Sequence, residues 1–244
     1  MLRAVADAGE LARSAAGEIL RLSGVALAER GVFHLALSGG STPRATYAEL
    51  ARLTRAADLS RWHVWFGDER CVLPDDARSN FRLARDSWLA GASLPADQVH
   101  RMRGEDAPAL AAERYERELF SALGDPPRLD LVLLGLGADG HTASLFPGSP
   151  ALHEAQAFVV PARADQPPYE RVTLTSRAIN AAREVLFLVA GAEKAEALGA
   201  LLAQQGSPDE LPALLVRPQG RVLWLADRAA LARTAPELVA ALRE

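Results

Sequence analysis

The segment LVLLGLGADGHTASLFPG at residues 131–148 begins with an apolar strand pattern and continues into a glycine-rich loop that carries an aspartate and a histidine. It continues the apolar run LDLVLLGLG at 129–137, which is typical of a central strand covered on both faces. Three glycines of the segment match the G-x-G-x-x-G pattern of dinucleotide-binding loops. The same loop carries Asp139 and His141, which a pyrophosphate-binding loop does not need. The segment therefore has two interpretations, a cofactor-binding loop or a catalytic loop.

Helical and strand-like patterns alternate on both sides of this segment. Helices are expected at 5–30, 43–53, 80–89, 106–122, 191–204 and the C-terminal end, and strand-like segments at 32–38, 62–69, 129–137, 157–162, 171–175, 184–191, 213–217 and 221–226. This alternation predicts one α/β domain, residues 1–244, with a largely parallel central sheet flanked by helices. In sheets of this kind the functional site lies in loops at the carboxyl ends of the strands.

The composition is that of an ordinary globular protein. Hydrophobic residues make up 49% and charged residues 24% of the 244 residues. The net charge of −4 argues against a nucleic-acid-binding protein, whose affinity depends on basic side chains. No apolar run approaches the roughly 18 residues of a membrane span, and the N-terminal residues lack the apolar core of a secretory signal. Because Cys71 is the only cysteine, a reducing, cytoplasmic location is expected.

The glycine-rich turn SGGSTP at 38–43 is the first loop with a candidate ligand site. Gly39 and Gly40 let a ligand approach the backbone closely because they carry no Cβ. Ser41 or Thr42 suits the N-cap position of the helix that follows. A turn of this kind presents free N–H groups to a phosphate, although the pattern is not a Walker A loop. The same residues also suit a tight turn with a well-capped helix.

Three charged residues, Asp68, Glu69 and Arg70, lie at the end of the second strand pattern. Asp68 can contact sugar hydroxyls or take part in proton transfer. Arg70 can bind a phosphate through two parallel hydrogen bonds. The alternative is a solvated cluster of charges where the strand leaves the sheet.

The loop with Asp139 and His141 lacks the context of a dinucleotide fingerprint. Such fingerprints usually follow the first strand and precede a strand that ends in an acidic residue. Here the strand is central, and the next strand pattern, 157–162, ends without an acid. A loop histidine is a natural general base near neutral pH, and a carboxylate lies two residues away. A capping aspartate beside an incidental histidine is the alternative.

Lys194 is the only lysine of the chain and lies in the first turn of the helix expected at 191–204. A cation at that position opposes the helix macrodipole, which favours a bound anion as its partner. A metal site is not expected, because the sequence has neither an HExxH pattern nor a cluster of cysteine and histidine residues.

Four ordered segments together resemble the motifs of the 6-phosphogluconolactonase family, whose broader relatives are the glucosamine-6-phosphate deaminases. The segments are LALSGGSTPRATY at 35–47, GDERCVLPDDARSNFRLA at 67–84, LDLVLLGLGADGHTASLFPGS at 129–149 and RVTLTSRAINAAREVLFLVAGAEKAEAL at 171–198. The resemblance implies a Rossmann-like α/β domain with the deaminase-like fold and without a nucleotide or other cofactor. It also implies hydrolysis of 6-phospho-D-glucono-1,5-lactone to 6-phospho-D-gluconate in the oxidative pentose phosphate pathway. The expected partner is therefore a small sugar-phosphate lactone, and a monomer is expected.

The resemblance also implies catalytic roles. His141 corresponds to the histidine that acts as the base in this family, and Asp68 corresponds to the acidic position at the strand end. Asp139 would orient the loop and stabilise the imidazolium, as a carboxylate partner does in other enzymes.

Binding of the sugar phosphate is implied for a second group of residues. The turn formed by Gly39, Gly40, Ser41 and Thr42 corresponds to the ligand loop of the family. Arg171 and Lys194 match positions that hold the phosphate, and Arg70 is a further candidate.

Two other functions remain as alternatives. A glucosamine-6-phosphate deaminase would carry a glutamate five residues after the histidine, where this sequence has Phe146, and MDEY where it has GDER. A non-catalytic sugar-phosphate sensor would keep the ligand loop but would need neither Asp68 nor His141. The differences at Phe146 and at GDER both favour a lactonase over a deaminase.

Overall fold

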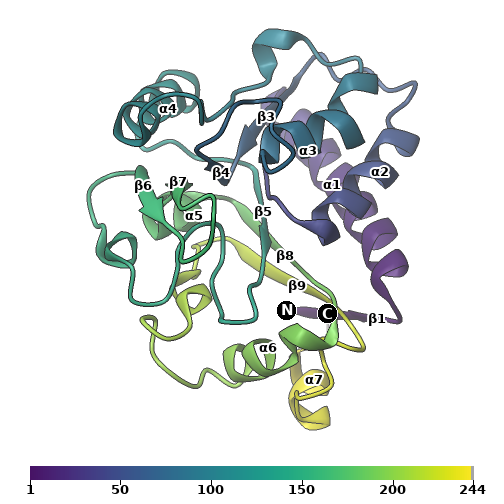
Figure 1. Ribbon diagram of the computed structural model, residues 1–244. Helices are drawn as coiled ribbons and strands as arrows, with labels where there is room; N and C mark the ends of the chain where they lie inside the picture. The colour runs from purple at the N-terminus through teal and green to yellow at the C-terminus, as the bar shows by residue number, and fades with distance from the viewer. Residues whose placement is uncertain (243–244) are drawn as a thin grey trace.

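A six-stranded parallel sheet forms the centre of the molecule (Figure 1). The computed structural model describes residues 1–242; the last two residues of the predicted domain, 243 and 244, lie outside that range. The strands lie in the order β1 (Leu2–Val5), β9 (Arg221–Asp227), β8 (Glu184–Val189), β5 (Leu131–Gly135), β2 (Phe33–Leu37) and β3 (Trp62–Phe66). Every pairing in this sheet is parallel, which confirms the predicted α/β class.

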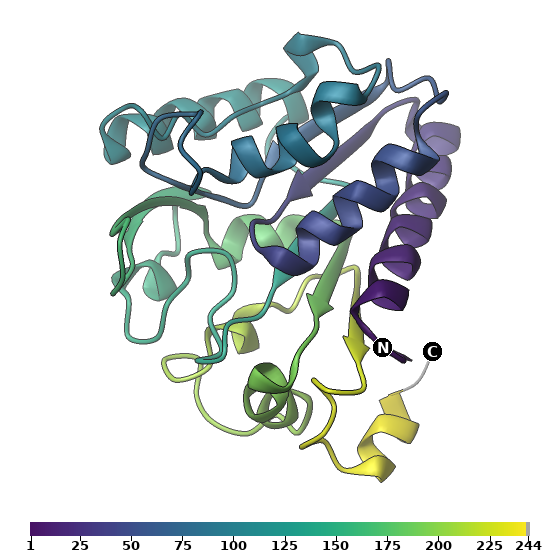
Figure 2. The same ribbon diagram turned by 45° about the vertical axis from the view of Figure 1, so that its right-hand side comes forward.

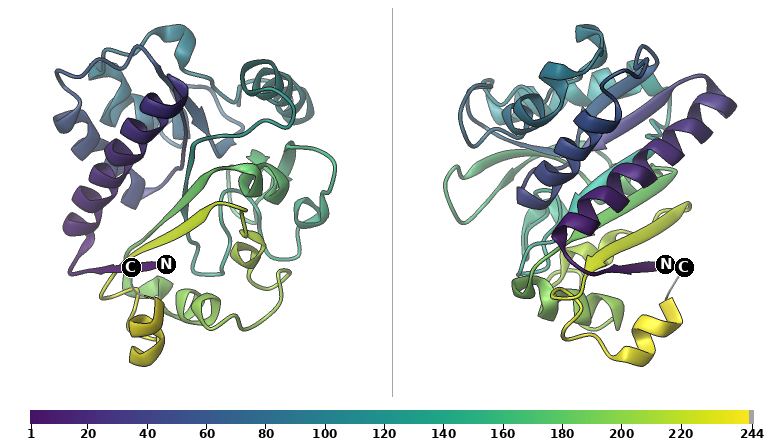
Figure 3. Two further views of the ribbon diagram at one scale, coloured as in Figure 1. Left: turned by 180° about the vertical axis from the view of Figure 1, so that it is seen from behind. Right: turned by 90° about the vertical axis from the view of Figure 1, so that its right-hand side faces the viewer.

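Helices cover both faces of the sheet (Figures 2 and 3). One face carries α1 (Ala8–Arg30), α2 (Ser41–Leu53) and α3 (Asn80–Ser87). The other face carries α4 (Pro108–Leu123), α5 (Ser176–Ala181) and α6 (Ala195–Leu202), and α7 (Pro236–Leu242) packs at its margin. Short 3-10 helices lie at Leu89–Gly91, Ala96–Gln98, Pro150–His153, Ala192–Lys194 and Pro212–Leu215.

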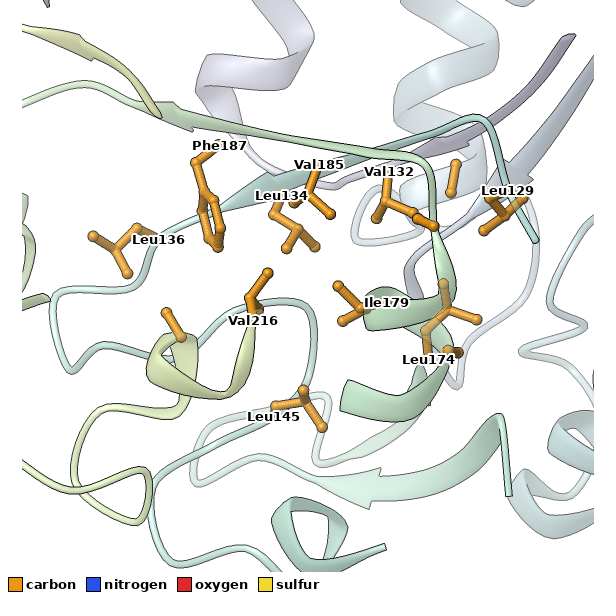
Figure 4. Close-up of a cluster of buried hydrophobic side chains, with 14 of the residues drawn as sticks. Leu129, Val132, Leu134, Leu136, Leu145, Leu174, Ile179, Val185, Phe187 and Val216 are labelled. Atoms are coloured by element: carbon orange, nitrogen blue, oxygen red, sulfur yellow. The ribbon is translucent and has the colours of Figure 1, made fainter. Parts of the chain in front are cut away.

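The apolar run of β5 is buried on both faces, as its sequence predicts. Leu131 and Leu133 pack in the core under α1 and α2. Val132 and Leu134 point the other way, toward α5 and the apolar residues around it (Figure 4). Successive side chains of a strand point to opposite faces, so a strand between two helical layers needs apolar residues at every position.

A second, antiparallel sheet lies beside the first and was not expected. It contains β4 (Asp68–Arg70), β7 (Glu170–Leu174) and β6 (Val159–Arg163), in that order. The prediction of a single strand at 62–69 is therefore wrong. The segment forms two strands, β3 and β4, which are separated at Gly67 and belong to different sheets. The Gly67 N–H donates to Leu37 of β2, and its carbonyl accepts from Leu174 at the end of β7. This residue thus joins the two sheets.

Two further elements differ from the prediction. Val5, the first residue of the helix predicted at 5–30, instead ends strand β1, and α1 begins only after Asp7, which caps the helix by accepting a hydrogen bond from the Glu10 N–H. The strand-like segment 213–217 lies mostly in a 3-10 helix that begins at Pro212. Proline has no N–H for a ladder and suits the first turn of a helix.

The parallel arrangement brings the loops after β2, β3, β5 and β8 to one edge of the sheet. These are the loops that carry the charged and glycine-rich residues of the sequence, as expected for a sheet whose strands all end on the same side. Within residues 1–242, no helix has the length and apolar character needed to span a bilayer.

Candidate active site

A cleft of about 710 Å³ opens where the loop after β5 meets the second sheet. Five of the candidate residues line it, namely Asp68, Arg70, Asp139, His141 and Arg171. The other lining residues are Ala138, Ala143, Ser144, Phe146, Pro147, Ala164, Asp165 and Gln166. The fold therefore collects acidic, basic and imidazole groups from segments that are far apart in the sequence.

Asp139 and His141 form a hydrogen-bonded pair in this cleft. The His141 Nδ1 lies 2.6 Å from the Asp139 Oδ1, and the His141 backbone N–H donates to the same oxygen at 3.2 Å. The hydrogen bond from His141 lowers the pKa of Asp139 to about 2, so Asp139 is a carboxylate at neutral pH. With Nδ1 donating to this carboxylate, neutral His141 has its Nε2 lone pair free to accept a proton.

Glycine at position 137 is required by this pair. A Cβ there would lie 2.1 Å from the His141 Nδ1 and 2.3 Å from the Asp139 Oδ1. The Gly137 N–H also donates to the His141 carbonyl at 2.8 Å, which closes the loop. By contrast, a Cβ at Gly135 would meet its nearest neighbour, the Ser38 Oγ, at 3.8 Å. The central glycine of the G-x-G-x-x-G match thus makes room for the Asp–His pair.

Phe146 packs against the imidazole of His141. Their ring centroids are 4.9 Å apart with an interplanar angle of 46°. The position where a deaminase of the resembled family would carry a glutamate is therefore occupied here by an aromatic ring in contact with His141.

Asp68 is buried and is held by two side-chain donors. Ser144 Oγ donates to its Oδ2 at 2.7 Å, and Asn80 Nδ2 donates to its Oδ1 at 3.0 Å. These contacts exclude the alternative of a solvated charge at the end of the strand, because Asp68 is only 7% exposed. The Asp68 carboxylate is therefore held in place by one hydrogen bond to each of its two oxygens.

The neighbouring Glu69 has a different role. Its carboxylate accepts hydrogen bonds from Ser79 Oγ and from the backbone N–H groups of Asn80 and Phe81, at 2.7–2.9 Å. Burial raises the pKa of Glu69, against the lowering effect of these donors. Glu69 therefore holds the start of α3, while Asp68 faces the cleft.

Arg70 and Arg171 lie opposite each other on the paired strands β4 and β7. Burial lowers the pKa of Arg171, and the positive charge of Arg70 lowers it further. Two neighbouring guanidinium groups at one side of a cleft form a site that favours an anion.

The glycine-rich turn is built differently from the prediction. Gly40, rather than Ser41 or Thr42, is the N-cap of α2, and no side chain caps the helix. Gly40 has φ of +114°, a conformation that favours glycine. Among residues 1–242 the backbone N–H groups of Ser41 and Thr42 have no hydrogen-bond partner, so the start of α2 is open to an anion.

Lys194 ends the 3-10 helix Ala192–Lys194 and is the N-cap residue of α6. Neither Lys194 nor the turn at 39–42 is among the residues that line the cleft. Both nevertheless follow the strands that flank β5, since β8 and β2 are its two neighbours. They lie at the same edge of the sheet as the cleft.

The structure adds Ser144, Asn80, Asp165 and Gln166 to the predicted residues. Ser144 belongs to the same motif as His141, but no spacing rule indicates that its hydroxyl reaches Asp68. Asn80 follows the N-cap serine of α3, where its amide gives no local sign of a distant partner. Within the described part of the chain, no group of three or more acidic, histidine or cysteine residues could hold a metal ion.

Comparison with known proteins identifies the family. Residues 6–224 match the family model described as glucosamine-6-phosphate isomerases/6-phosphogluconolactonase. The chain is 45% identical to a 6-phosphogluconolactonase from Synechocystis over 210 residues, which is 84% of this chain and 86% of that protein. It is 41% identical to the human 6-phosphogluconolactonase over 208 residues, 82% and 80% of the two chains. The solved 6-phosphogluconolactonase from Trypanosoma cruzi has a TM-score of 0.85 and 30% identity, with 95% of each chain covered. The chain therefore belongs to the glucosamine-6-phosphate isomerase/6-phosphogluconolactonase family.

Proposed function

We propose that this protein hydrolyses 6-phospho-D-glucono-1,5-lactone to 6-phospho-D-gluconate, a step of the oxidative pentose phosphate pathway. The observation that carries the proposal is the Asp139–His141 pair, which lines one cleft with the arginines of β4 and β7. Relatives that are 41–45% identical to this protein, over more than four fifths of its chain, are 6-phosphogluconolactonases. A general base next to an anion-binding site is what hydrolysis of a phosphorylated lactone requires.

In the proposed mechanism, the Nε2 of neutral His141 takes a proton from water as the water oxygen forms a bond to C1 of the lactone. Asp139 keeps the imidazole oriented and stabilises the imidazolium that results. The bond between C1 and the ring oxygen then breaks, and the imidazolium returns its proton to that oxygen. The product is the open-chain acid, which ionises in water. No covalent intermediate is needed, because the lactone carbonyl is already electrophilic.

We assign phosphate binding to the arginines of the cleft and to groups at the same edge of the sheet. Arg171, Lys194 and the N–H groups of residues 39–42 would hold the 6-phosphate, and Arg70 would assist. Asp68 would accept hydrogen bonds from sugar hydroxyls. Fixing the phosphate uses binding energy to position the reacting carbon, which lies at the other end of the sugar.

The geometry of the site argues against a deaminase and against a dinucleotide-binding enzyme. A deaminase would place a glutamate at position 146, but Phe146 packs on the His141 ring instead. A dinucleotide-binding site would need an open glycine loop, whereas the Asp139–His141 pair fills the space beside Gly137. Ammonia release from glucosamine 6-phosphate, or binding of NAD(P) by the purified protein, would favour these alternatives over lactone hydrolysis.

The experiment that tests the function is a lactone-hydrolysis assay corrected for the spontaneous reaction. We expect His141→Ala to lower kcat by about 10²–10⁴-fold, the range of general base catalysis. We expect Lys194→Ala mainly to raise KM, because it removes a group that binds the phosphate before and during the reaction. His153→Ala is the matched control, because His153 also pairs with an aspartate, Asp209, at 3.2 Å, but lies outside the cleft. A His141→Ala enzyme with near-normal kcat would contradict the base assignment.

The monomeric state and the cytoplasmic location also belong to this proposal. The lone, partly buried Cys71 supports a reducing compartment. Size-exclusion chromatography with light scattering would measure the oligomeric state directly.

A further inference from the structure

Ser144 connects Asp68 to the loop that carries His141. Its side chain is fully buried, and its Oγ donates to the Asp68 Oδ2 at 2.7 Å, across 76 positions of sequence. Its backbone N–H donates to the Oγ1 of Thr173 at 3.1 Å. Thr173 is the residue opposite Asp68 in the β4–β7 pairing. Ser144 is therefore bonded to both strands of the β4–β7 pair, at the residue where β4 begins.

The turn that carries Ser144 is held in an unusual backbone conformation. The Leu145 N–H donates to the Thr142 carbonyl at 2.9 Å, and Ala143 between them has φ of +49°. A left-handed conformation is strained for a residue with a Cβ, because the Cβ comes too close to the following carbonyl oxygen. Such strain persists where the surroundings determine the conformation, and it is frequent at functional sites. The two hydrogen bonds of Ser144 are the contacts that tie this turn to the second sheet.

Asn80 fixes the other oxygen of Asp68 and extends the connection to the glycine-rich turn. Its Nδ2 donates to the Asp68 Oδ1 and to the Asp68 carbonyl. A Cβ on Gly39 would lie 1.9 Å from the Asn80 Oδ1, so Gly39 leaves the room that Asn80 occupies. The Asn80 side chain is almost completely buried between these two groups.

We propose that Ser144 is a positioning residue that fixes Asp68 relative to His141, with Asn80 as the second support of the same carboxylate. The proposal rests on the function proposed above. Each carboxylate oxygen receives one hydrogen bond from these neutral donors and has a second lone-pair direction open. Asp68 then acts as an acceptor for hydroxyl groups of the sugar, and its fixed orientation turns C1 toward the His141 Nε2.

The test is a double-mutant cycle with Ser144→Ala and Asp68→Ala, assayed for lactone hydrolysis. We expect Ser144→Ala to lower kcat about tenfold with KM within about twofold, since misplacement of a bound substrate costs rate more than affinity. We expect no further loss when Ser144→Ala is added to Asp68→Ala, because the residue acts through Asp68. Where Asp68→Ala does not fold, Asp68→Leu, which also removes both acceptor oxygens, provides the second background.

Thr142→Val is the matched control. Thr142 lies in the same turn and is equally buried, but its Oγ1 donates to the Gly135 carbonyl and not to Asp68. The control should keep kcat within about twofold of the unaltered enzyme, because the Asp68 contact is intact. Equal losses in Thr142→Val and Ser144→Ala, or losses that add in the double mutant, would overturn the proposal. An unaltered enzyme without lactonase activity would instead refute the proposed function itself.

Discussion

At the scale of single residues, the structure changes the meaning of the G-x-G-x-x-G match. In a dinucleotide-binding loop the second glycine admits a pyrophosphate. Here the space beside Gly137 is filled by Asp139 and His141. The pair could be predicted from the sequence because the two residues are only two positions apart. The requirement for glycine at position 137 could not be predicted from the sequence, because it depends on the path of the folded loop.

Substitutions of two glycines in this motif test whether the Asp139–His141 pair requires glycine at position 137. Gly137→Ala should lower kcat about 10²-fold, because the new Cβ forces the Asp139–His141 pair out of its geometry and small misplacements are costly. Gly135→Ala is the control, because its Cβ would meet nothing closer than 3.8 Å. Lactonase kinetics of both variants provide the measurement. Similar kinetics in the two variants would argue that the pair tolerates displacement.

At the scale of elements, α3 depends on a carboxylate from the second sheet. Glu69 of β4 accepts hydrogen bonds from the first two backbone N–H groups of α3 and from the N-cap side chain, Ser79. The first N–H groups of a helix have no partner within the helix, and an acidic group stabilises that end. The same helix begins with Asn80, which supports Asp68. The position of Asp68 thus depends on how firmly α3 is held.

Replacing Glu69 by glutamine should weaken this junction. The glutamine has one acceptor oxygen, and its NH₂ group would face donors, so we expect the free energy of unfolding to fall by about 1–3 kcal/mol. Urea denaturation at neutral pH measures the change. Glu49→Gln, which removes an exposed ion pair with Arg52 on α2, should change stability by less than about 0.5 kcal/mol. A Glu69→Gln protein as stable as the parent would show that α3 does not need this carboxylate.

At the scale of the whole molecule, three histidines lie away from the cleft, near the amino ends of β2 and β3. His34 and His63 are paired across these strands, and His63 Nδ1 lies 2.9 Å from the Nε2 of His100. Burial, followed by the charges of His63 and His100, lowers the pKa of His34 to about 4. Burial also lowers the pKa of His63. Both rings are therefore neutral in the folded protein near neutral pH.

This cluster makes the folded state sensitive to acid. The unfolded chain binds a proton at His34 near pH 6.5, whereas the folded chain does so only near pH 4, so stability is lost as the pH falls between these values. The difference in pKa corresponds to a loss of about 3 kcal/mol. The free energy of unfolding should therefore fall between pH 7 and pH 4.5, and His34→Gln should flatten this slope. His153→Gln is the control, because the His153 side chain is 70% exposed; an unchanged slope in His34→Gln would contradict the assignment.

The sequence by itself determined the features that depend on local order along the chain. The alternation of helical and strand-like segments predicted the α/β class, and the unbroken apolar run predicted that β5 is covered on both faces. The loops that carry charged, histidine and glycine-rich residues could be placed at one edge of the sheet, because the carboxyl ends of parallel strands lie on the same side. The adjacency of Asp139 and His141 is local as well.

Only the tertiary structure decided which strands pair and which distant groups meet. The period of side chains indicates the faces of a strand but not its neighbour, so nothing in β4, β6 and β7 revealed a separate antiparallel sheet. The different roles of Asp68 and Glu69 follow from that sheet, since alternate residues of one strand point to opposite faces. The contact of Ser144 with Asp68 spans 76 positions, and such a hydrogen bond exists only once the fold has brought both loops to the same place.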